Sequence, residues 1–308
     1  MIIILMQMLS IAVFGFIWQF IAEKVTDNAV NATMSRAVIS ALVYYFMLPA
    51  LILDVLWQAP LQENSIYIAI MAAGGVLGSL LLALLFSRFS TLPRATIGAI
   101  ILAASFPNAT YMGLPVLEET FGSWSMSIAL QYDMFACTPI LLSLGIFIAS
   151  SYGQQEKLGT LLVSMLKVPA IWATVLAILL NLSAIPIPDF LYGIFHKMGN
   201  TVIPLMLFSL GLSLPVRLIS LKHIKAVIVI SCIQLLIMPM IVWLIGQSVP
   251  ISSDYLAPVV IEGAMPSMLL GLVLCHRYKL DVGLYASAVT ISSLASLLSL
   301  PLVLKLLV

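Results

Sequence analysis

The sequence has little charge. Only 8% of its 308 residues are Asp, Glu, Lys or Arg, whereas 62% are hydrophobic, and the mean hydropathy is +1.17. A soluble domain is nearer half apolar and about a quarter charged, so a water-soluble fold of this length would leave much apolar surface exposed. The apolar runs are continuous rather than short and alternating, which argues against a transmembrane β-barrel. The sequence therefore predicts an all-α polytopic membrane protein.

Other chemically informative residues are also scarce. The net charge of +1 offers no electrostatic attraction for nucleic acid. The three cysteines lie in apolar runs without paired or metal-ligand spacing: Cys137, Cys232 and Cys275. The three histidines lie near helix ends, far apart in sequence: His196, His223 and His276. We therefore expect neither a metal site nor a cofactor.

Ten apolar segments each have about the 20 residues needed to cross a bilayer. Their approximate limits are 2–22, 37–57, 65–87, 94–120 (broken), 124–150, 168–186, 191–214, 224–247, 254–276 (broken) and 283–306. The first lacks a basic start and a cleavage site, so it is expected to be a spanning helix rather than a signal peptide. The polar stretch at mid-chain divides the segments five and five. We predict a first repeat at 1–150, a cytoplasmic linker at 151–167 and a second repeat at 168–308.

The basic residues predict the orientation. If the loops alternate sides, 11 of the 13 Lys and Arg residues fall on one side, and only Lys197 and Lys305 fall on the other. The side richer in Lys and Arg is the cytoplasmic one. Both chain ends are therefore predicted to lie on the periplasmic or extracellular side.

Prolines recur at similar positions in the two halves. Pro49 and Pro204 are 155 residues apart, and Pro115 and Pro266 are 151 residues apart. A repeat with an odd number of spans must be inverted in the membrane when it recurs. Inverted repeats with matching broken helices are characteristic of secondary transporters, so the sequence predicts two inverted five-helix repeats with breaks in the fourth and ninth helices.

The fourth segment is interrupted by FPNATYMGLP, residues 106–115. A second half-helix is expected to begin at Pro115, because proline suits a first helical turn, with Gly113 before it supplying backbone freedom. Pro266 with Gly263 is expected to repeat this arrangement in the ninth segment. The simpler alternative is a pair of proline kinks that serve only packing.

The predicted breaks suggest a binding site. Two half-helices would direct the positive ends of their dipoles toward the membrane centre. The expected product is a small polar pocket that favours anions, lined by Asn108, Thr110, Ser267 and freed backbone groups. Backbone N–H and C=O groups without helical hydrogen bonds are tolerated at this depth in the membrane only where protein or water satisfies them.

Two carboxyl groups are predicted to be buried in the membrane. Asp133 lies roughly 14 Å into the fifth span at 1.5 Å per residue, and Glu262 lies in the ninth span, four residues before Pro266. A charge at the bilayer centre costs at least about 2.5–3.5 kcal/mol. We therefore expect both groups to couple transport to a proton or a sodium ion, or to form structural hydrogen bonds. The sequence leaves coupling to H⁺, to Na⁺ or to neither open.

These residues resemble the auxin efflux carrier family. The stretch NATYMGLP is similar to the family's first-repeat motif, in which Asn is followed by Gly five residues later and by Pro two residues after that. The stretches at 47–53 and 203–212 are similar to the family's second and seventh helices, so the resemblance covers the whole chain. It identifies Asn108, Gly113 and Pro115 with the first crossover and Pro266 with the second.

The resemblance implies a secondary carrier of organic anions, which are auxin in plant members and dicarboxylates such as malonate or malate in some bacterial ones. It implies a crossover fold in which helices 1, 2, 6 and 7 form a scaffold, often dimeric. Helices 3–5 and 8–10 would form a moving transport domain, an elevator-type mechanism. The central loop of about 17 residues is similar to that of bacterial members, which implies the inner membrane. The ninth helix departs from the family pattern because EGAMPS has no asparagine beside its break.

The sequence thus predicts a secondary active transporter of a small organic anion, with the lipid bilayer, its substrate and a second copy as partners. The first alternative is a cation antiporter that uses Asp133 and Glu262. An intramembrane enzyme would need paired catalytic aspartates, a zinc motif or Asp-rich loops, and a membrane sensor would need an output domain. Neither set of features is found in the sequence, so we do not expect an enzyme.

Overall fold

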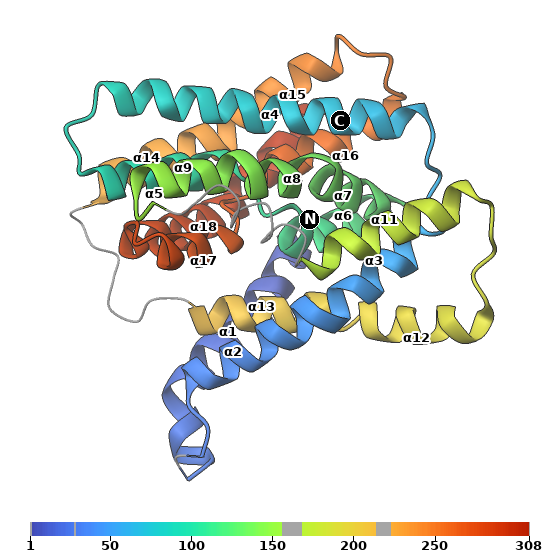
Figure 1. Cartoon of the computed structure of the whole chain (residues 1–308), viewed down its shortest axis with the longest axis horizontal. Helices are drawn as coiled ribbons and strands as arrows, with labels where there is room; N and C mark the ends of the chain where they lie inside the picture. Colours follow the sequence, from blue (N-terminus) through green and yellow to red (C-terminus); the bar gives the residue numbers. More distant parts are fainter. Residues whose placement is uncertain (1, 28, 156–167, 214–222, 308) are drawn as a thin grey trace. The chain divides into compact units, whose positions relative to one another are not determined.

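The computed structural model describes residues 2–27, 29–155, 168–213 and 223–307, and these residues form helices joined by short connections (Figure 1). Within them, the only β-structure is one isolated bridge. In the described part of the chain, six helical stretches are long and apolar enough to cross a membrane: Met6–Val25, Ala32–Leu56, Glu63–Arg88, Ser123–Tyr152, Ile224–Gly246 and Val282–Leu307. The prediction of an all-α polytopic membrane protein is confirmed.

The remaining predicted spans consist of shorter helices. These are α5 (Arg94–Ser105), the π-helical turn η2 (Ala109–Gly113), α6 (Leu114–Phe121), α11 (Pro169–Leu182), α12 (Asp189–Gly199), α13 (Val202–Ser213), α16 (Ser253–Gly263) and α17 (Leu270–Arg277). The count of ten spans and the inverted repeat remain predictions. The predicted linker lies largely outside the described residues, as do four basic residues used to predict the orientation: Lys157, Lys167, Arg217 and Lys222.

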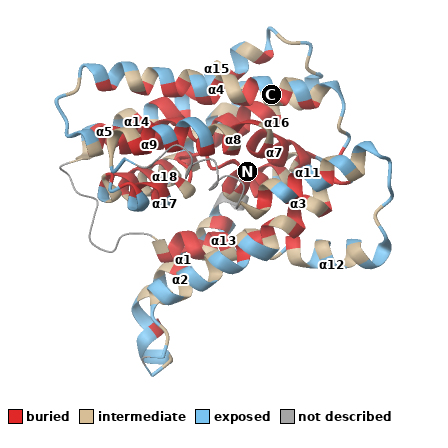
Figure 2. Ribbon diagram, viewed as in Figure 1, coloured by how far each residue is buried: buried red, intermediate tan, exposed pale blue. Residues whose placement is uncertain are grey.

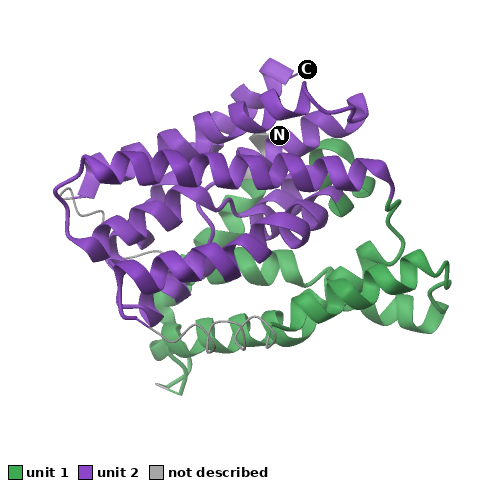
Figure 3. Cartoon of the chain, turned by 45° about the horizontal axis from the view of Figure 1, so that its top comes forward, with its two compact units in different colours: residues 1–61, 118–127, 168–214 green, residues 62–117, 128–167, 215–308 purple. Residues whose placement is uncertain are grey.

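The chain divides into two compact units (Figure 3). Unit 1 comprises residues 1–61, 118–127 and 168–214. Its helices are α1 (Ile2–Val25), α2 (Ala32–Leu42), η1 (Val43–Met47), α3 (Leu48–Leu56), α11, α12 and α13, with the end of α6, the 3₁₀ turn η3 (Ser123–Ser125) and the first two residues of α7. Within it, α13 packs against α1 and α2, and α3 packs against α11 and α12.

Helices α1 and α13 approach each other unusually closely because glycines lie at their contact. A methyl group added to Gly15 would overlap the carbonyl oxygen of Phe208, and one added to Gly211 would overlap that of Ala12. The side chain of Gln19 donates a hydrogen bond to the carbonyl oxygen of Gly211 at 2.8 Å. Small residues allow such backbone contact between membrane helices, where packing rather than burial from water stabilises the pair.

Unit 2 comprises residues 62–117, 128–167 and 215–308. Its elements are α4 (Glu63–Arg88), α5, η2, η4 (Asp133–Cys137), α8 (Thr138–Ile140), η5 (Leu141–Gly145), α9 (Ile146–Tyr152), α14 (Ile224–Cys232), η7 (Ile233–Ile237), α15 (Met238–Gly246), α16, α17 and α18 (Val282–Leu307), with most of α7 (Met126–Tyr132) and the start of α6.

Helix α5 forms the centre of unit 2. Residues 96–105 are all buried, and α5 is largely red in Figure 2. Helices α4, α9, α14 and α18 pack around it. The break that ends α5 therefore lies inside the unit.

We predict that Gly211→Ala destabilises the protein, because the new methyl group must push α1 and α13 apart. Overpacking of this kind costs about 1–3 kcal/mol, and the thermal unfolding midpoint of the purified protein should fall. The matched control is Gly193→Ala in α12, where no atom lies within 4 Å of the added methyl group. Equal midpoints for the two variants would show that the α1–α13 contact is not tight.

Candidate functional site

The two helix interruptions of unit 2 lie side by side and bond to each other. Pro107 and Ser267 form an antiparallel bridge. The backbone N–H of Asn108 donates to the carbonyl oxygen of Pro266 at 2.8 Å, and the N–H of Met268 donates to that of Phe106 at 2.9 Å. Backbone groups released by one break are thus satisfied by the other, which an apolar surrounding requires.

The first interruption is shorter than predicted. The α-helix α6 begins at Leu114, so Pro115 lies in its first turn as expected, but a π-helical turn precedes this helix. Helical structure resumes at Ala109 in the π-helical turn η2, and the N–H of Leu114 donates to the carbonyl oxygen of Ala109. A π-turn bonds residues five apart and is wider than an α-turn. Pro115 therefore lies one turn after the start of the helical stretch at Ala109. Because the preceding turn is π-helical, the missing N–H of the proline breaks no α-helical hydrogen bond there.

The role expected of Gly113 was wrong. Among the described glycines only Gly122 has a positive φ, of 96°, so Gly113 does not supply an unusual backbone angle. Instead, a methyl group on Gly113 would overlap the carboxyl group of Glu262. The glycine is needed because that carboxyl group packs directly on the η2 backbone.

The second interruption is longer. Helix α16 ends at Gly263 and α17 begins at Leu270, four residues after Pro266, so Pro266 does not start the half-helix as predicted. It lies in the extended link and offers its carbonyl oxygen to Asn108. A methyl group on Gly263 would lie 2.8 Å from the side chain of Val242. This glycine therefore permits close packing of α16 on α15.

Ser267 holds the link in place. Its hydroxyl donates to the carbonyl oxygen of Ala103 at 2.7 Å, and its backbone N–H donates to the hydroxyl oxygen of Ser292 at 3.2 Å. Both polar groups are committed to protein partners, so Ser267 ties the second interruption to α5 and α18.

Asp133 is buried and well partnered. Thr138 donates to its Oδ1 at 2.8 Å, and Thr110 donates to its Oδ2. Asp133 begins the π-turn η4, whereas Thr110 belongs to η2. The predicted residues Thr110 and Asp133 are thus brought together, and Asp133 also lies within electrostatic range of Glu262.

Several polar atoms beside the interruptions have no hydrogen-bond partner. Glu262 is fully buried and Asn108 is 1% exposed, yet both carboxyl oxygens of Glu262 and both amide atoms of Asn108 are unpartnered. The same is true of the Gln234 amide oxygen and the Tyr132 hydroxyl. Buried polar groups are nearly always paired in folded proteins, so this cluster is the strongest candidate for a ligand site.

Sequence reasoning missed Gln234 and Tyr132. Gln234 lies in the π-turn η7, and its amide donates to the carbonyl oxygen of Met265 at 3.1 Å, within the second interruption. The sequence did offer a signal for Gln234, because a polar amide side chain inside an apolar span indicates a functional residue. Tyr132 offered none, because its position beside Asp133 does not reveal which way its hydroxyl points.

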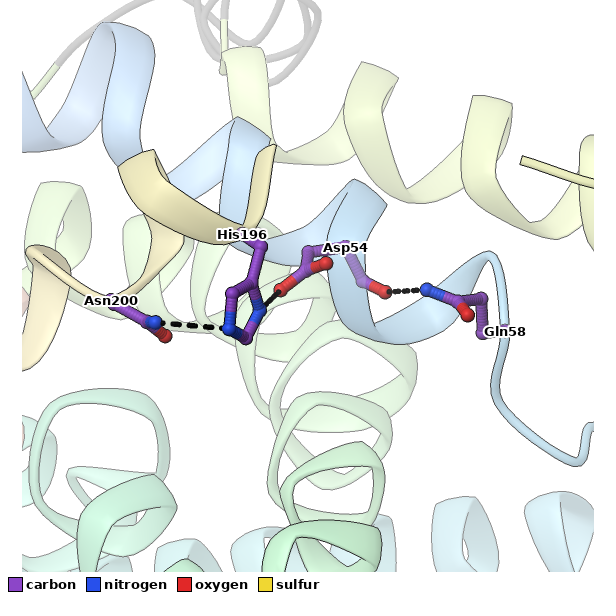
Figure 4. A network of polar contacts seen from close by, with 4 residues as sticks. All are labelled: Asp54, Gln58, His196 and Asn200. Carbon is purple, nitrogen blue, oxygen red and sulfur yellow. Dashed lines mark hydrogen bonds and ion pairs between the residues drawn. The ribbon is translucent and has the colours of Figure 1, made fainter. Parts of the chain in front are cut away.

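A second polar cluster, in unit 1, was also missed (Figure 4). Nδ1 of His196 in α12 lies 3.0 Å from Oδ2 of Asp54 in α3, and the other ring nitrogen lies 3.2 Å from the Asn200 amide. Gln58 donates to the backbone carbonyl oxygen of Asp54 at 3.2 Å. Asp54 and His196 are 142 residues apart, so sequence spacing gives no sign of the pair.

A cavity of about 540 Å³ lies in the same unit. Its lining includes Gln58 and Tyr192, and the Tyr192 ring stacks on that of His196 with 5.3 Å between centroids. The Asp54–His196 pair therefore fixes one side of this cavity by joining α3 to α12.

We predict that His196→Ala lowers the thermal unfolding midpoint, because it leaves the Asp54 carboxyl buried without its partner. Leaving a buried polar group without its partner costs about 1–3 kcal/mol, and the cost should lie near the lower end here because only Asp54 is buried, whereas the His196 side chain is 49% exposed. Lys197→Ala, which alters the exposed neighbouring residue, should leave the midpoint unchanged. A His196→Ala variant as stable as Lys197→Ala would contradict a structural role for the pair.

Membrane-length apolar helices around an interrupted, polar centre are features of a membrane transporter. Residues 2–304 match the model of the membrane transport protein family. The chain belongs to this family, that of the auxin efflux carriers.

Relatives of the chain are named as transporters. It is 28% identical over 300 residues to an "Uncharacterized transporter" of Methanothermobacter thermautotrophicus, covering 96% of this chain and 95% of the relative. It is 26% identical over 209 residues, 67% of each chain, to "Uncharacterized transporter MJ1031" of Methanocaldococcus jannaschii. It is 22% identical over 220 residues to "Uncharacterized transporter YfdV" of Escherichia coli, covering 70% of this chain and 69% of the relative.

Proposed function

We propose that this membrane transporter is a secondary active carrier of a small organic anion, a dicarboxylate such as malonate or malate or an auxin-like acid, in a bacterial inner membrane. The proposed site lies at the paired interruptions, where the fourth and ninth helices would cross. The observation that carries the proposal is the unpartnered, buried side chain of Asn108 beside the start of a helix at Ala109. An amide and a helix N-terminus together offer donors to a carboxylate without a fixed cation.

We further propose an elevator mechanism, in which unit 2 carries the substrate and unit 1 is the scaffold of a homodimer. Its support is the division of the chain. Unit 1 gathers the segments predicted as spans 1, 2, 6 and 7, with residues 118–127 from the end of span 4 and the start of span 5. Unit 2 gathers the rest of spans 3–5 and spans 8–10. The predicted site residues from Asn108 to Pro115 and from Gly263 to Ser267, with Asp133 and Glu262, all belong to unit 2.

A cation antiporter remains the second candidate. The observation that favours it is the pairing of Asp133 and Glu262 in one buried cluster. Two carboxyl groups without a nearby base are suited to binding protons or a sodium ion. Under this alternative the two carboxyls alone would carry the transported species.

The test is uptake of radiolabelled malonate, malate and indole-3-acetate into proteoliposomes under imposed proton or sodium gradients. We expect saturable uptake of one anion by the wild type. Asn108→Ala should reduce it by about tenfold or more, the effect of losing a hydrogen bond to a charged group. Asn64→Ala is the matched control, because Asn64 bonds only at an exposed helix end, to Ser252. Gradient-driven proton or sodium flux without uptake of any anion would support the antiporter instead.

Gly113→Ala should reduce uptake about tenfold while the protein still inserts in the membrane. The added methyl group must displace the Glu262 carboxyl from the η2 backbone, and a shift of this kind costs about 1–3 kcal/mol. Gly283→Ala is the control, because its methyl group would meet only an ordinary contact at 3.6 Å, with Asp281. Wild-type uptake by Gly113→Ala would show that this packing does not matter for transport.

A further inference from the structure

Among the described residues of unit 2, two carboxyl groups are buried, and their surroundings are opposite. Both oxygens of Asp133 accept hydrogen bonds from threonine hydroxyls, whereas neither oxygen of Glu262 has a partner. A buried carboxylate is tolerated when donors solvate it and is costly when none does. The two groups therefore differ in how readily each holds a negative charge.

The backbone is shaped to supply one of the donors to Asp133. Thr138 follows Asp133 by five residues, and its N–H also donates to the carbonyl oxygen of Asp133, closing the π-turn η4. At about 100° per residue, an α-helix would place residues five apart on different faces. The π-turn brings them to the same face, so the fold uses a local irregularity to keep a hydroxyl against Asp133.

The second donor comes from the interruption. Thr110 lies in η2, directly after Asn108 and Ala109, and donates to Asp133. The Asp133 charge is therefore bonded to the segment that carries the proposed substrate site. An ionised Asp133 held in this way would orient η2, and its protonation state would not need to change during transport.

Glu262 is placed differently. Its carboxyl group lies against the backbone of Gly113, fully buried, on the helix that leads into the second interruption. The ionisable groups that interact electrostatically with the Glu262 carboxyl are Asp133, Tyr132 and Cys137.

The elements packed against α16 bring no buried charge of opposite sign to Glu262. Their charged residues, Glu63, Arg88 and Lys305, are exposed. Tyr285 donates its hydroxyl to the carbonyl oxygen of Met268. No described basic side chain therefore compensates Glu262.

We propose that Glu262 is the proton carrier of the transporter and that Asp133 remains an ionised positioning residue throughout the cycle. The Glu262 carboxylate accepts one proton from water on the side of higher proton concentration, and the carboxylic acid returns it to water on the other side. A neutral Glu262 leaves a single negative charge, that of Asp133, beside the incoming anion. The coupling of this proton to transport rests on the proposed function of anion transport. Which of the two carboxyl groups is protonated can be measured without any substrate.

The first experiment is infrared difference spectroscopy of the purified protein in lipid during a pH titration. The carbonyl absorption of a protonated, buried carboxylic acid should appear in the wild type and in Asp133→Asn, and it should be lost in Glu262→Gln. Asp254→Asn, at the exposed start of the same helix, is the matched control and should keep the band. Loss of the band in Asp133→Asn, or absence of the band from the wild type, would overturn the assignment. Both of these results can be obtained even if Glu262→Gln does not fold.

The second experiment measures uptake of the same three anions with and without an inward proton gradient. The gradient should stimulate wild-type uptake about fivefold or more, and whatever uptake Glu262→Gln retains should show a stimulation ratio near one. Persisting stimulation in Glu262→Gln would contradict the proposal. If the wild type takes up none of the anions but the infrared band behaves as expected, the proposed function fails and the assignment of the proton to Glu262 stands.

Discussion

The structure depends on the requirement that backbone polar groups be satisfied in an apolar surrounding. Two helices of unit 2 are interrupted, and each interruption would leave several N–H and C=O groups bare. The bonds of Asn108 to Pro266 and of Met268 to Phe106 satisfy part of this need mutually. Ser267, through Ala103 and Ser292, fixes the arrangement. The two breaks are bonded to each other, so they form one structural element.

This element concentrates polar side chains where the rest of the unit is apolar. Asn108 and Glu262 are buried without partners, while the Asp133 carboxylate is bonded by two hydroxyls. Three π-turns contribute polar residues to this region: η2 contributes Thr110, η4 contributes Asp133 and η7 contributes Gln234. Such turns recur at functional sites because they redirect side chains without ending a helix. The proposed anion site and proton carrier follow from this local concentration of unsatisfied polarity.

Composition and apolar runs were enough to predict a helical membrane protein, and the motif at 108–115 was enough to predict its family. The position of both interruptions was also predicted, because proline and glycine close together within an apolar run seldom leave a helix unbroken. Their detailed form was not. Sequence places Pro115 near a helix start but does not reveal a π-turn, and it cannot show that Gly113 is small because Glu262 packs on it. Contacts between distant segments, such as Asp54 with His196, have no local signal.

The central claim, that the transported anion binds at the paired interruptions, is tested most directly by substrate protection of a single cysteine. Asn108→Cys would be introduced into a chain whose three native cysteines are replaced by alanine, and its alkylation rate measured with and without each anion. The account predicts that the transported anion slows alkylation at position 108 and that anions which are not transported leave it unchanged. An alkylation rate unaffected by an anion that the protein demonstrably transports would contradict the claim.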